Sequence, residues 1–232
     1  VAVVGTGMSK FGTLPGVSNR ELFVEAFTNL QSTVDRGLDP KDVEANYVGC
    51  CGAWHWESQG GVGTWCTDWA GLIPIPSTTI DNACASASVA IRNGIMAIAS
   101  GLYDVVLAGG VEKMTALPTE ETTSIVATGS DVLWEGYAGY TFPGLYATMA
   151  TAHMNQFGTT SEDLLNVAIK NHHNGALNPR AQMPNTITDI MAQRKARAFE
   201  KGRTVPEWAS EMDFLLDGNF NPMIAWPLTL FD

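Results

Sequence analysis

The chain has 232 residues and a formal net charge of −11, and only 16% of its residues are charged. This negative balance argues against a nucleic acid or an anionic membrane as a partner. Hydrophobic residues make up 45% of the chain and there are 23 glycines, which is ordinary for a globular α/β protein. We see no apolar run of 18 residues and no signal-peptide pattern, so we expect a cytoplasmic protein without a membrane span.

The cysteine pattern indicates a reduced protein without a metal site. The four cysteines are Cys50, Cys51, Cys66 and Cys84, with no C-x-x-C spacing among them. Adjacent cysteines are a poor chelating pair, so the pattern favours free thiols. A zinc site that uses the neighbouring His55 is the less favoured alternative.

The first part of the chain alternates between strand-like and helix-like segments. Residues 1–4 are expected to form a buried strand, followed by glycines at positions 5 and 7. Lys10 stands where a dinucleotide-binding G-x-G-x-x-G pattern needs its third glycine, which favours a plain tight turn. The spacing of apolar residues predicts a helix over residues 19–35, and residues 43–51 read as a strand.

Four tryptophans lie within 16 residues, at positions 54, 56, 65 and 69. Tryptophan is enriched at protein interfaces, so one interpretation is a subunit contact. The other is an aromatic wall for a bulky substrate. The sequence leaves both open.

Cys84 lies between a strand-like run, residues 73–80, and a helix-like run, residues 85–100. A thiol at the head of a helix meets unpaired N–H groups and the positive end of the helix dipole. A partly buried dipole interaction of about 2 kcal/mol would lower the pKa by roughly 1.5 and ionise about half of the thiol at neutral pH. Cys84 is therefore a candidate nucleophile; the alternative is a buried cysteine that packs as a small hydrophobe.

Two motifs together resemble the N-terminal half of the thiolase family. The first is "DNACASASVAIRNG" at residues 81–94, and the second is "DVVLAGGVEKMT" at residues 104–115. The opening of the chain resembles thiolases of the sterol-carrier-protein type. The resemblance implies an α/β, thiolase-like fold, with a mixed, mostly parallel sheet covered by helices on both faces and a helical loop subdomain. It makes Cys84 the nucleophile, with site support from Asn82, Gly109, Gly110, Glu112 and Met114.

The resemblance also implies a division into a nucleophile-bearing core, residues 1–114, and a loop subdomain, residues 115–232. Within the second part, residues 115–141 read as loop, and helices are expected over residues 145–157, 161–174 and 186–201. Residues 184–220 look like an insertion, either surface decoration, a substrate lid or a docking surface. This segment carries a basic cluster, Arg194, Lys195, Arg197, Lys201 and Arg203.

The function implied by the resemblance is that of an acyl-CoA C-acyltransferase in lipid or aromatic degradation. Coenzyme A would be a substrate, and no covalently bound cofactor or metal is expected. Trp54, Trp56, Phe142 and Met149 are candidates for the substrate or CoA region. The alternatives are a thiolase-like aldolase that acts on an acyl-CoA and a non-catalytic scaffold subunit.

Thiolases carry a G-H-P histidine and a C-x-G cysteine in a C-terminal half; this sequence has no G-H-P, and its C-x-G match, Cys50-Cys51-Gly52, lies in the part that resembles the N-terminal half. The chain is therefore a fragment, one subunit of a split thiolase, or a degenerate homologue. The expected partners are acyl-CoA and CoA, a second copy in a homodimer or higher oligomer, a separate C-terminal half, and an accessory protein with a zinc ribbon and an OB fold.

Overall fold

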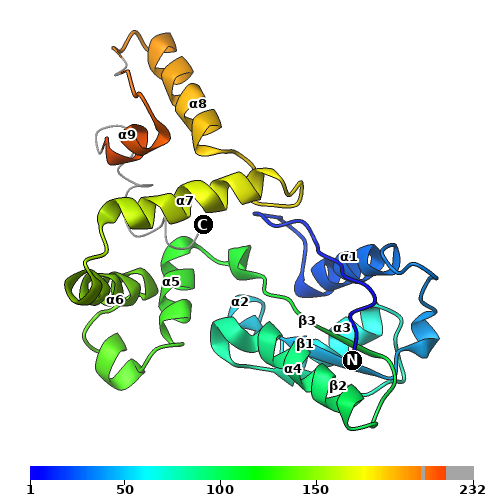
Figure 1. Ribbon diagram of the computed structural model, residues 1–232. Helices are drawn as coiled ribbons and strands as arrows, with labels where there is room; N and C mark the ends of the chain where they lie inside the picture. Colours follow the sequence, from blue (N-terminus) through cyan, green and yellow to red (C-terminus); the bar gives the residue numbers. More distant parts are fainter. Residues whose placement is uncertain (205–206, 218–232) are drawn as a thin grey trace. The chain divides into compact units, whose positions relative to one another are not determined.

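The computed structural model describes residues 1–204 and 207–217 (Figure 1). The chain divides into two compact units, Val1–Gly129 and Ser130–Asp232. Each unit is described by itself. The sequence placed the change of character at residue 115, whereas the first unit of the structure runs on to Gly129.

A three-stranded parallel sheet forms the centre of the first unit. The strands are β1 (Ala45–Gly49), β2 (Ser77–Ile80) and β3 (Val106–Gly110), in the order β2-β1-β3. Gly49 at the end of β1 pairs with Ile80 on one side and Gly110 on the other. The carboxyl ends of all three strands therefore lie at one edge of the sheet.

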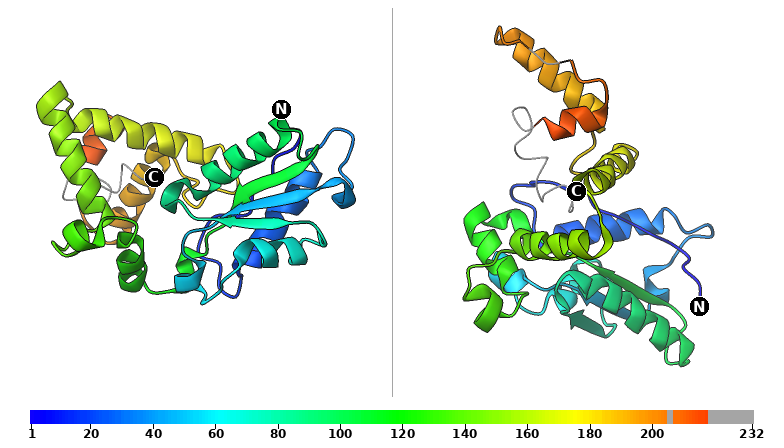
Figure 2. Two further views of the ribbon diagram at one scale, coloured as in Figure 1. Left: turned by 90° about the horizontal axis from the view of Figure 1, so that it is seen from below. Right: turned by 60° about the vertical axis from the view of Figure 1, so that its left-hand side comes forward.

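Helices cover both faces of this sheet, as predicted (Figure 2). Helix α4 (Ser86–Ala99) packs on one face, where Gly94 lies close to Val106 and Ala108. Successive side chains of a strand point to opposite faces. Asn46 of β1 accordingly points to the face opposite α4, where α3 (Val62–Trp69) packs. Its Nδ2 donates to Thr67 Oγ1 over 2.8 Å.

Helix α1 (Asn19–Gln31) packs beside α3 and ends four residues before its predicted end. Its start is fixed by a capping box, in which the Ser18 backbone N–H and hydroxyl donate to the Glu21 carboxylate, each over 2.6 Å. Phe23 joins the core with residues of β1, α2 (Ala53–Trp56) and α3. A short 3-10 turn, Pro40–Asp42, precedes β1.

The prediction of a buried strand at residues 1–4 is wrong. No described strand includes these residues, and Val1, Val3 and Val4 are 74%, 82% and 65% exposed. The described sheet has the order β2-β1-β3 without a fourth strand, and the exposed valines lack the burial of a core strand. The segment that follows is tied to the end of α1 instead, where Thr6 N donates to Thr33 Oγ1 over 2.9 Å.

The prediction of a loop over residues 115–141 is also wrong in part. Helix α5 (Thr119–Ala127) lies within it, between a 3-10 turn at Met114–Ala116 and a π-helical turn at Val132–Gly136. Two glutamates in the first turn of α5 favour a helix start, since they lie at the positive end of the dipole. The β-branched residues of this stretch have low helix propensity, so the sequence pattern did not predict the helix.

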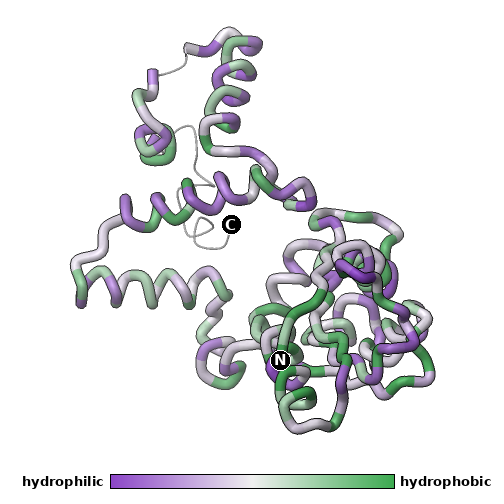
Figure 3. The backbone as a smooth tube through the Cα atoms, turned by 45° about the vertical axis from the view of Figure 1, so that its right-hand side comes forward, coloured by the Kyte–Doolittle hydropathy of each residue, from purple (hydrophilic) through white to green (hydrophobic). Residues whose placement is uncertain are grey.

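The second unit is helical. It contains α6 (Phe142–Phe157), α7 (Ser161–Ala176), α8 (Ile187–Glu200) and α9 (Glu211–Leu216). The first three confirm the predicted helices. Capping boxes at Thr160 and Thr186 begin α7 and α8. Hydrophobic and hydrophilic residues alternate along both helices, as expected for amphipathic elements (Figure 3).

The segment interpreted as an insertion folds onto α7 with a small core of its own. This core consists of Leu165, Ile187, Trp208, Phe214 and Leu215. The Trp208 and Phe214 rings meet edge to face at 4.9 Å, and Trp208 Nε1 donates to Asp217 Oδ2 over 2.9 Å. Residues 205–206 and 218–220 of the proposed insertion lie outside the described residues. Within the described part of the chain, no helix is both long and apolar enough to cross a membrane.

Candidate active site

Three connections meet at the carboxyl edge of the sheet. The ladder continues one residue past the strands, since Cys50 N donates to Ile80 O over 2.9 Å and Val111 N donates to Gly49 O over 3.0 Å. In open parallel sheets this edge is where ligands bind. It brings together three segments that are far apart in the sequence, residues 50–56, 81–85 and 111–113.

Cys84 lies in the connection after β2, as the sequence predicts. It is exposed in a 3-10 turn, Ala83–Ala85, that leads directly into α4. Ala83 has φ +48°, a left-handed conformation that a non-glycine residue rarely adopts. Such backbone strain is frequent at functional sites and persists only where the surroundings hold it.

The turn around Cys84 is held by its neighbours. Asn82 N donates to Ser86 Oγ over 2.8 Å, and that hydroxyl donates to Ala83 O over 2.7 Å. Ala83 N donates to Asp81 Oδ1 over 3.1 Å. Asn82 thus contributes its main chain to the turn, and Ser86 is a positioning residue that the sequence interpretation missed.

Two glycines allow α4 to approach the sheet closely. A Cβ on Gly110 would lie 2.7 Å from Ala87 Cβ, and a Cβ on Gly49 would lie 2.4 Å from Ala87 N. Both distances are too short for a real side chain, so the first turn of the helix needs glycine at both positions. Gly109 is different, because a Cβ there would meet no described atom within 4 Å. Of the two glycines expected to support the site, only Gly110 packs closely against α4, and Gly49 does so as well.

The Glu112 carboxylate, which follows β3 in the chain, accepts hydrogen bonds from the connection after β1. Its Oε2 accepts from Cys51 N over 2.8 Å and from the Cys51 thiol over 3.2 Å. Its Oε1 accepts from Gly52 N over 3.1 Å, from Trp56 Nε1 over 2.7 Å and from the Cys50 thiol over 3.4 Å. One carboxylate thus fixes residues 50–56, more than 55 positions away in the sequence.

The environment of this connection keeps its thiols protonated. Burial and the nearby Glu112 carboxylate raise the pKa of both Cys50 and Cys51 to about 12. Burial raises the pKa of Cys66, in α3, to about 12 as well. A thiolate is the nucleophilic form of cysteine, so these three side chains are poor nucleophiles near neutral pH.

The remaining predicted site residues divide between the surface, the core and the second unit. Trp54 is 73% exposed, but Trp56 is buried and bonded to Glu112, so Trp56 is a support residue rather than a substrate wall. Met114 is exposed at the start of the turn that follows β3. Phe142 and Met149 lie on α6 of the second unit, and their role at the Cys84 site stays a prediction.

Lys113 is a further residue that the sequence interpretation passed over. It is 6% exposed, and its Nζ donates to Leu14 O over 2.6 Å, which ties the N-terminal segment to the carboxyl edge.

As for a metal, the described residues contain no group of three His, Cys, Asp or Glu side chains placed to hold one.

Comparison with known proteins places this geometry in a family. The model of the thiolase N-terminal domain matches residues 1–209. The chain is similar to the acetyl-CoA acetyltransferase of Methanothermobacter thermautotrophicus, with 47% identity over 188 residues, 81% of this chain and 48% of the relative. It is also similar to the bovine sterol carrier protein 2, with 30% identity over 211 residues, 86% of this chain and 38% of the relative.

A third relative is the benzoylsuccinyl-CoA thiolase subunit BbsB of Thauera aromatica, with 29% identity over 194 residues, 81% of this chain and 46% of the relative. The chain spans about half the length of the acetyl-CoA acetyltransferases that it matches.

Proposed function

Because the chain belongs to the thiolase family, we propose that it supplies the nucleophile-bearing half of a thiolase-type acyl-CoA C-acyltransferase, with Cys84 as the nucleophile. One observation carries the proposal most. Cys84 is exposed at the head of α4, whereas the pKa of each of the other three thiols is raised to about 12. Near the head of a helix, a side chain meets backbone N–H groups that have no partner within the helix.

The proposed reaction proceeds in two steps. The Cys84 thiolate attacks the keto carbon of a 3-oxoacyl-CoA, and the bond between that carbon and Cα breaks. The electron pair of the broken bond stays on Cα, which takes a proton and leaves as a shorter acyl-CoA. The thiol of free CoA then attacks the acyl-Cys84 thioester, which gives a second acyl-CoA and regenerates the cysteine. We assign the proton donor to the C-terminal half.

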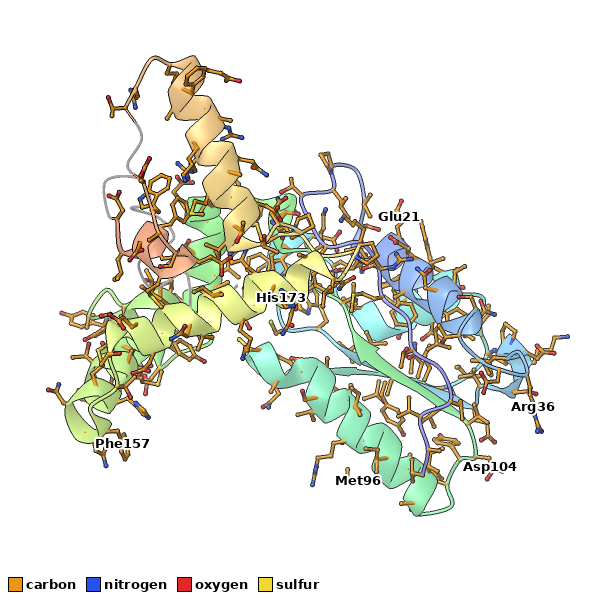
Figure 4. All side chains as sticks on the ribbon, turned by 45° about the horizontal axis from the view of Figure 1, so that its top comes forward. Glu21, Arg36, Met96, Asp104, Phe157 and His173 are labelled. Carbon is orange, nitrogen blue, oxygen red and sulfur yellow. The ribbon has the colours of Figure 1, made fainter. Side chains whose placement is uncertain are left out.

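An exposed apolar surface on α4 supports a second half or partner chain over this region. Ile91, Ile95 and Met96 are 47%, 48% and 44% exposed on this helix, and Figure 4 shows Met96 directed away from the sheet. Contiguous apolar surface of this kind is typical of protein contacts. We propose that a C-terminal thiolase half, in the same polypeptide or on a separate chain, covers this surface of α4. We also propose that the protein forms a homodimer or a higher oligomer. A zinc-ribbon and OB-fold accessory protein is a further proposed partner.

The test is capture of the acyl-enzyme. The 232-residue chain, alone and co-expressed with a C-terminal half, is incubated with acetoacetyl-CoA, and acyl groups are located by peptide mass mapping. We expect one acetyl group on Cys84, lost in Cys84→Ala and kept in Cys51→Ala. Acetylation at another cysteine would contradict the assignment.

The same experiment separates the alternatives. A non-catalytic scaffold subunit is the first alternative. It would remain unacylated even with the partner present. A thiolase-like aldolase would retain carbon–carbon cleavage in Cys84→Ala, because those enzymes resemble this family without depending on the cysteine.

We further propose that the basic cluster of α8 faces an acidic partner or the phosphates of CoA. Arg194, Arg197 and Lys201 are exposed in a chain of net charge −11, and Lys195 lies over the Trp208 ring at 5.4 Å. Replacing Arg194 and Arg197 by glutamate leaves the small core intact. We expect this variant to lose partner co-purification or to raise the Michaelis constant for CoA. Replacing the same two arginines by glutamine should show about half of the effect in free energy. If neither measurement changes, the basic cluster of α8 binds neither a partner nor CoA.

A further inference from the structure

The first unit contains a cavity that the Cys84 chemistry does not use. Its volume is about 230 Å³, and it lies where the start of α1 meets α3. Its lining includes Arg20, Glu57, Val62, Trp65, Cys66 and Trp69. Helix α3 packs on the sheet face opposite α4, as the side-chain alternation of β1 requires, so the cavity is separate from the nucleophile's helix.

The lining carries two opposite charges, Arg20 and Glu57. Both side chains are partly exposed, so a ligand in the cavity can reach them. They form no ion pair with each other, and neither forms one with any other residue in the described part of the chain. A cation and a carboxyl group thus face one cavity, and each is open to a partner of opposite charge.

The Arg20 guanidinium is held in place by three other residues of the lining. One N–H donates to Gln59 Oε1 over 2.5 Å, and the guanidinium lies over the Trp65 and Trp69 rings at 4.9 and 5.3 Å. Stacking on the rings uses the flat face of the group, and the remaining N–H donors have no partner among the described residues. This N–H edge is the part of an arginine that binds a carboxylate through two parallel hydrogen bonds.

The Glu57 carboxyl group lies across the lining from these donors in the chain, on the segment between α2 and α3. Its two oxygens accept from the backbone N–H of Asn19, over 3.2 and 3.3 Å, and each oxygen keeps a further lone pair. Burial raises the pKa of Glu57, although the more distant charges of Lys113 and Arg20 lower it. A cation placed beside the carboxylate would favour its charged form.

The rest of the lining is largely apolar. Val62 and Cys66 are 4% and 0% exposed and belong to the core of the first unit. Trp65 and Trp69 are 41% and 49% exposed and add indole surface. A cavity with an apolar lining and a few polar groups is the usual form of a small-molecule site.

We propose that this cavity binds a zwitterionic amino acid with an apolar side chain. The carboxylate of the ligand accepts from Arg20, its ammonium group donates to Glu57, and its side chain contacts the apolar lining. A simple anion would meet the Glu57 charge and a simple cation would meet the Arg20 charge, whereas a zwitterion satisfies both. The site does not depend on the acyl-transfer function, because no residue of the Cys84 turn or of the Glu112 network lines it.

The probe is L-leucine, and two compounds that each lack one of its charges are the matched comparisons. Isocaproate lacks the ammonium group and isoamylamine lacks the carboxylate. Binding to the 232-residue chain is followed by the NMR shifts of the Trp65 and Trp69 indole N–H groups, assigned with single Trp→Phe variants. For leucine we expect a dissociation constant of about 0.1–1 mM, with both comparison compounds about tenfold weaker.

Variants of the two charged residues test each half of the recognition. Glu57→Gln keeps an acceptor oxygen for the Asn19 N–H, so it should weaken leucine about tenfold but strengthen isocaproate, which no longer meets a negative charge. Arg20→Met should weaken leucine and strengthen isoamylamine. Arg36→Met, an exposed arginine outside the lining, is the matched control and should bind leucine normally. Circular dichroism checks that every variant is folded.

Three results would overturn the proposal. Isocaproate binding as tightly as leucine would make this an anion site governed by Arg20. Unchanged leucine binding by folded Glu57→Gln would remove the carboxyl group from recognition. No shift with any of the three compounds would mean that the cavity holds water alone.

Discussion

The connections after β1 and after β2 end at the same edge of the sheet, and each exposes one cysteine. Around Cys51, the Glu112 carboxylate binds two backbone N–H groups, an indole and two thiols, and it helps to raise the pKa of Cys51 to about 12. Around Cys84, the side chains of Ser86 and Asp81 hold the turn through hydrogen bonds to its backbone groups.

The difference shows that exposure alone does not make a thiol reactive. A carboxylate and removal of water keep Cys51 in its protonated form, whereas Cys84 lies at the head of a 14-residue helix, α4, with no carboxylate bonded to its thiol in the described part of the chain. One connection is therefore a hydrogen-bonded support, and the other carries the proposed nucleophile.

The largest expected effect follows from forcing α4 away from the sheet. Gly110→Val places a side chain where Ala87 Cβ already lies 2.7 Å from the added Cβ position. Overpacking of this kind typically costs about 1–3 kcal/mol, and the shift would displace the Cys84 turn as well. Urea unfolding should show a large loss of stability.

Gly109→Ala is the control, because a Cβ at Gly109 would meet no described atom within 4 Å. It should leave the unfolding midpoint nearly unchanged. A fully folded but merely slow Gly110→Val protein would count against the close-packing argument.

The next test removes the charge that distinguishes the two connections. Glu112→Gln keeps the shape of the side chain but replaces one of its two acceptor oxygens by an NH₂ group. The N–H and S–H donors that share both oxygens of Glu112 would then have one, so we expect a loss of about 1–3 kcal/mol of unfolding free energy. The pKa of Cys51 should fall toward its ordinary value, so its alkylation begins at lower pH. The rate at Cys84 in the same sample is the internal control. An unchanged pH profile for Cys51 would show that burial alone sets its pKa.

Cys66 shows the effect of burial without a bonded carboxylate, and its effect on stability is confined to alkaline pH. Its pKa is raised from an ordinary 9.0 to about 12, so between these values the unfolded chain loses the proton while the folded chain keeps it. The free energy of unfolding should therefore fall as pH rises through this window, by about 1.4 kcal/mol per pH unit for each such thiol.

Cys66→Ala should be less stable at neutral pH because it leaves a cavity, but its stability should fall less steeply above pH 9. Urea midpoints measured on both sides of that pH check the slope. Parallel pH profiles for the two proteins would contradict the raised pKa of Cys66.

How much the sequence could predict depended on the range of the interactions. The helices at α1, α6, α7 and α8 follow from local apolar spacing and caps, and the position of Cys84 at a strand-to-helix junction follows from local pattern as well. The strand wrongly predicted at residues 1–4 would need a partner strand far away in the sequence, which local pattern does not reveal.

The support network is equally non-local. Glu112 bonds residues more than 55 positions away, and Gly49 matters only because Ala87 lies over it. Neighbouring Gly109 and Gly110 look alike in the sequence, yet only Gly110 faces α4. Contacts of this kind required the structure.

The most direct test of the central claim is competition between the two exposed thiols. The folded chain is treated with limiting iodoacetamide at neutral pH, and alkylation of Cys84 and Cys51 is followed over time by peptide mass mapping. We expect Cys84 to be alkylated well before Cys51, Cys50 or Cys66, since the pKa of each of those three is raised to about 12. An inert Cys84 beside a rapidly alkylated Cys51 would contradict the assignment of Cys84 as the nucleophile.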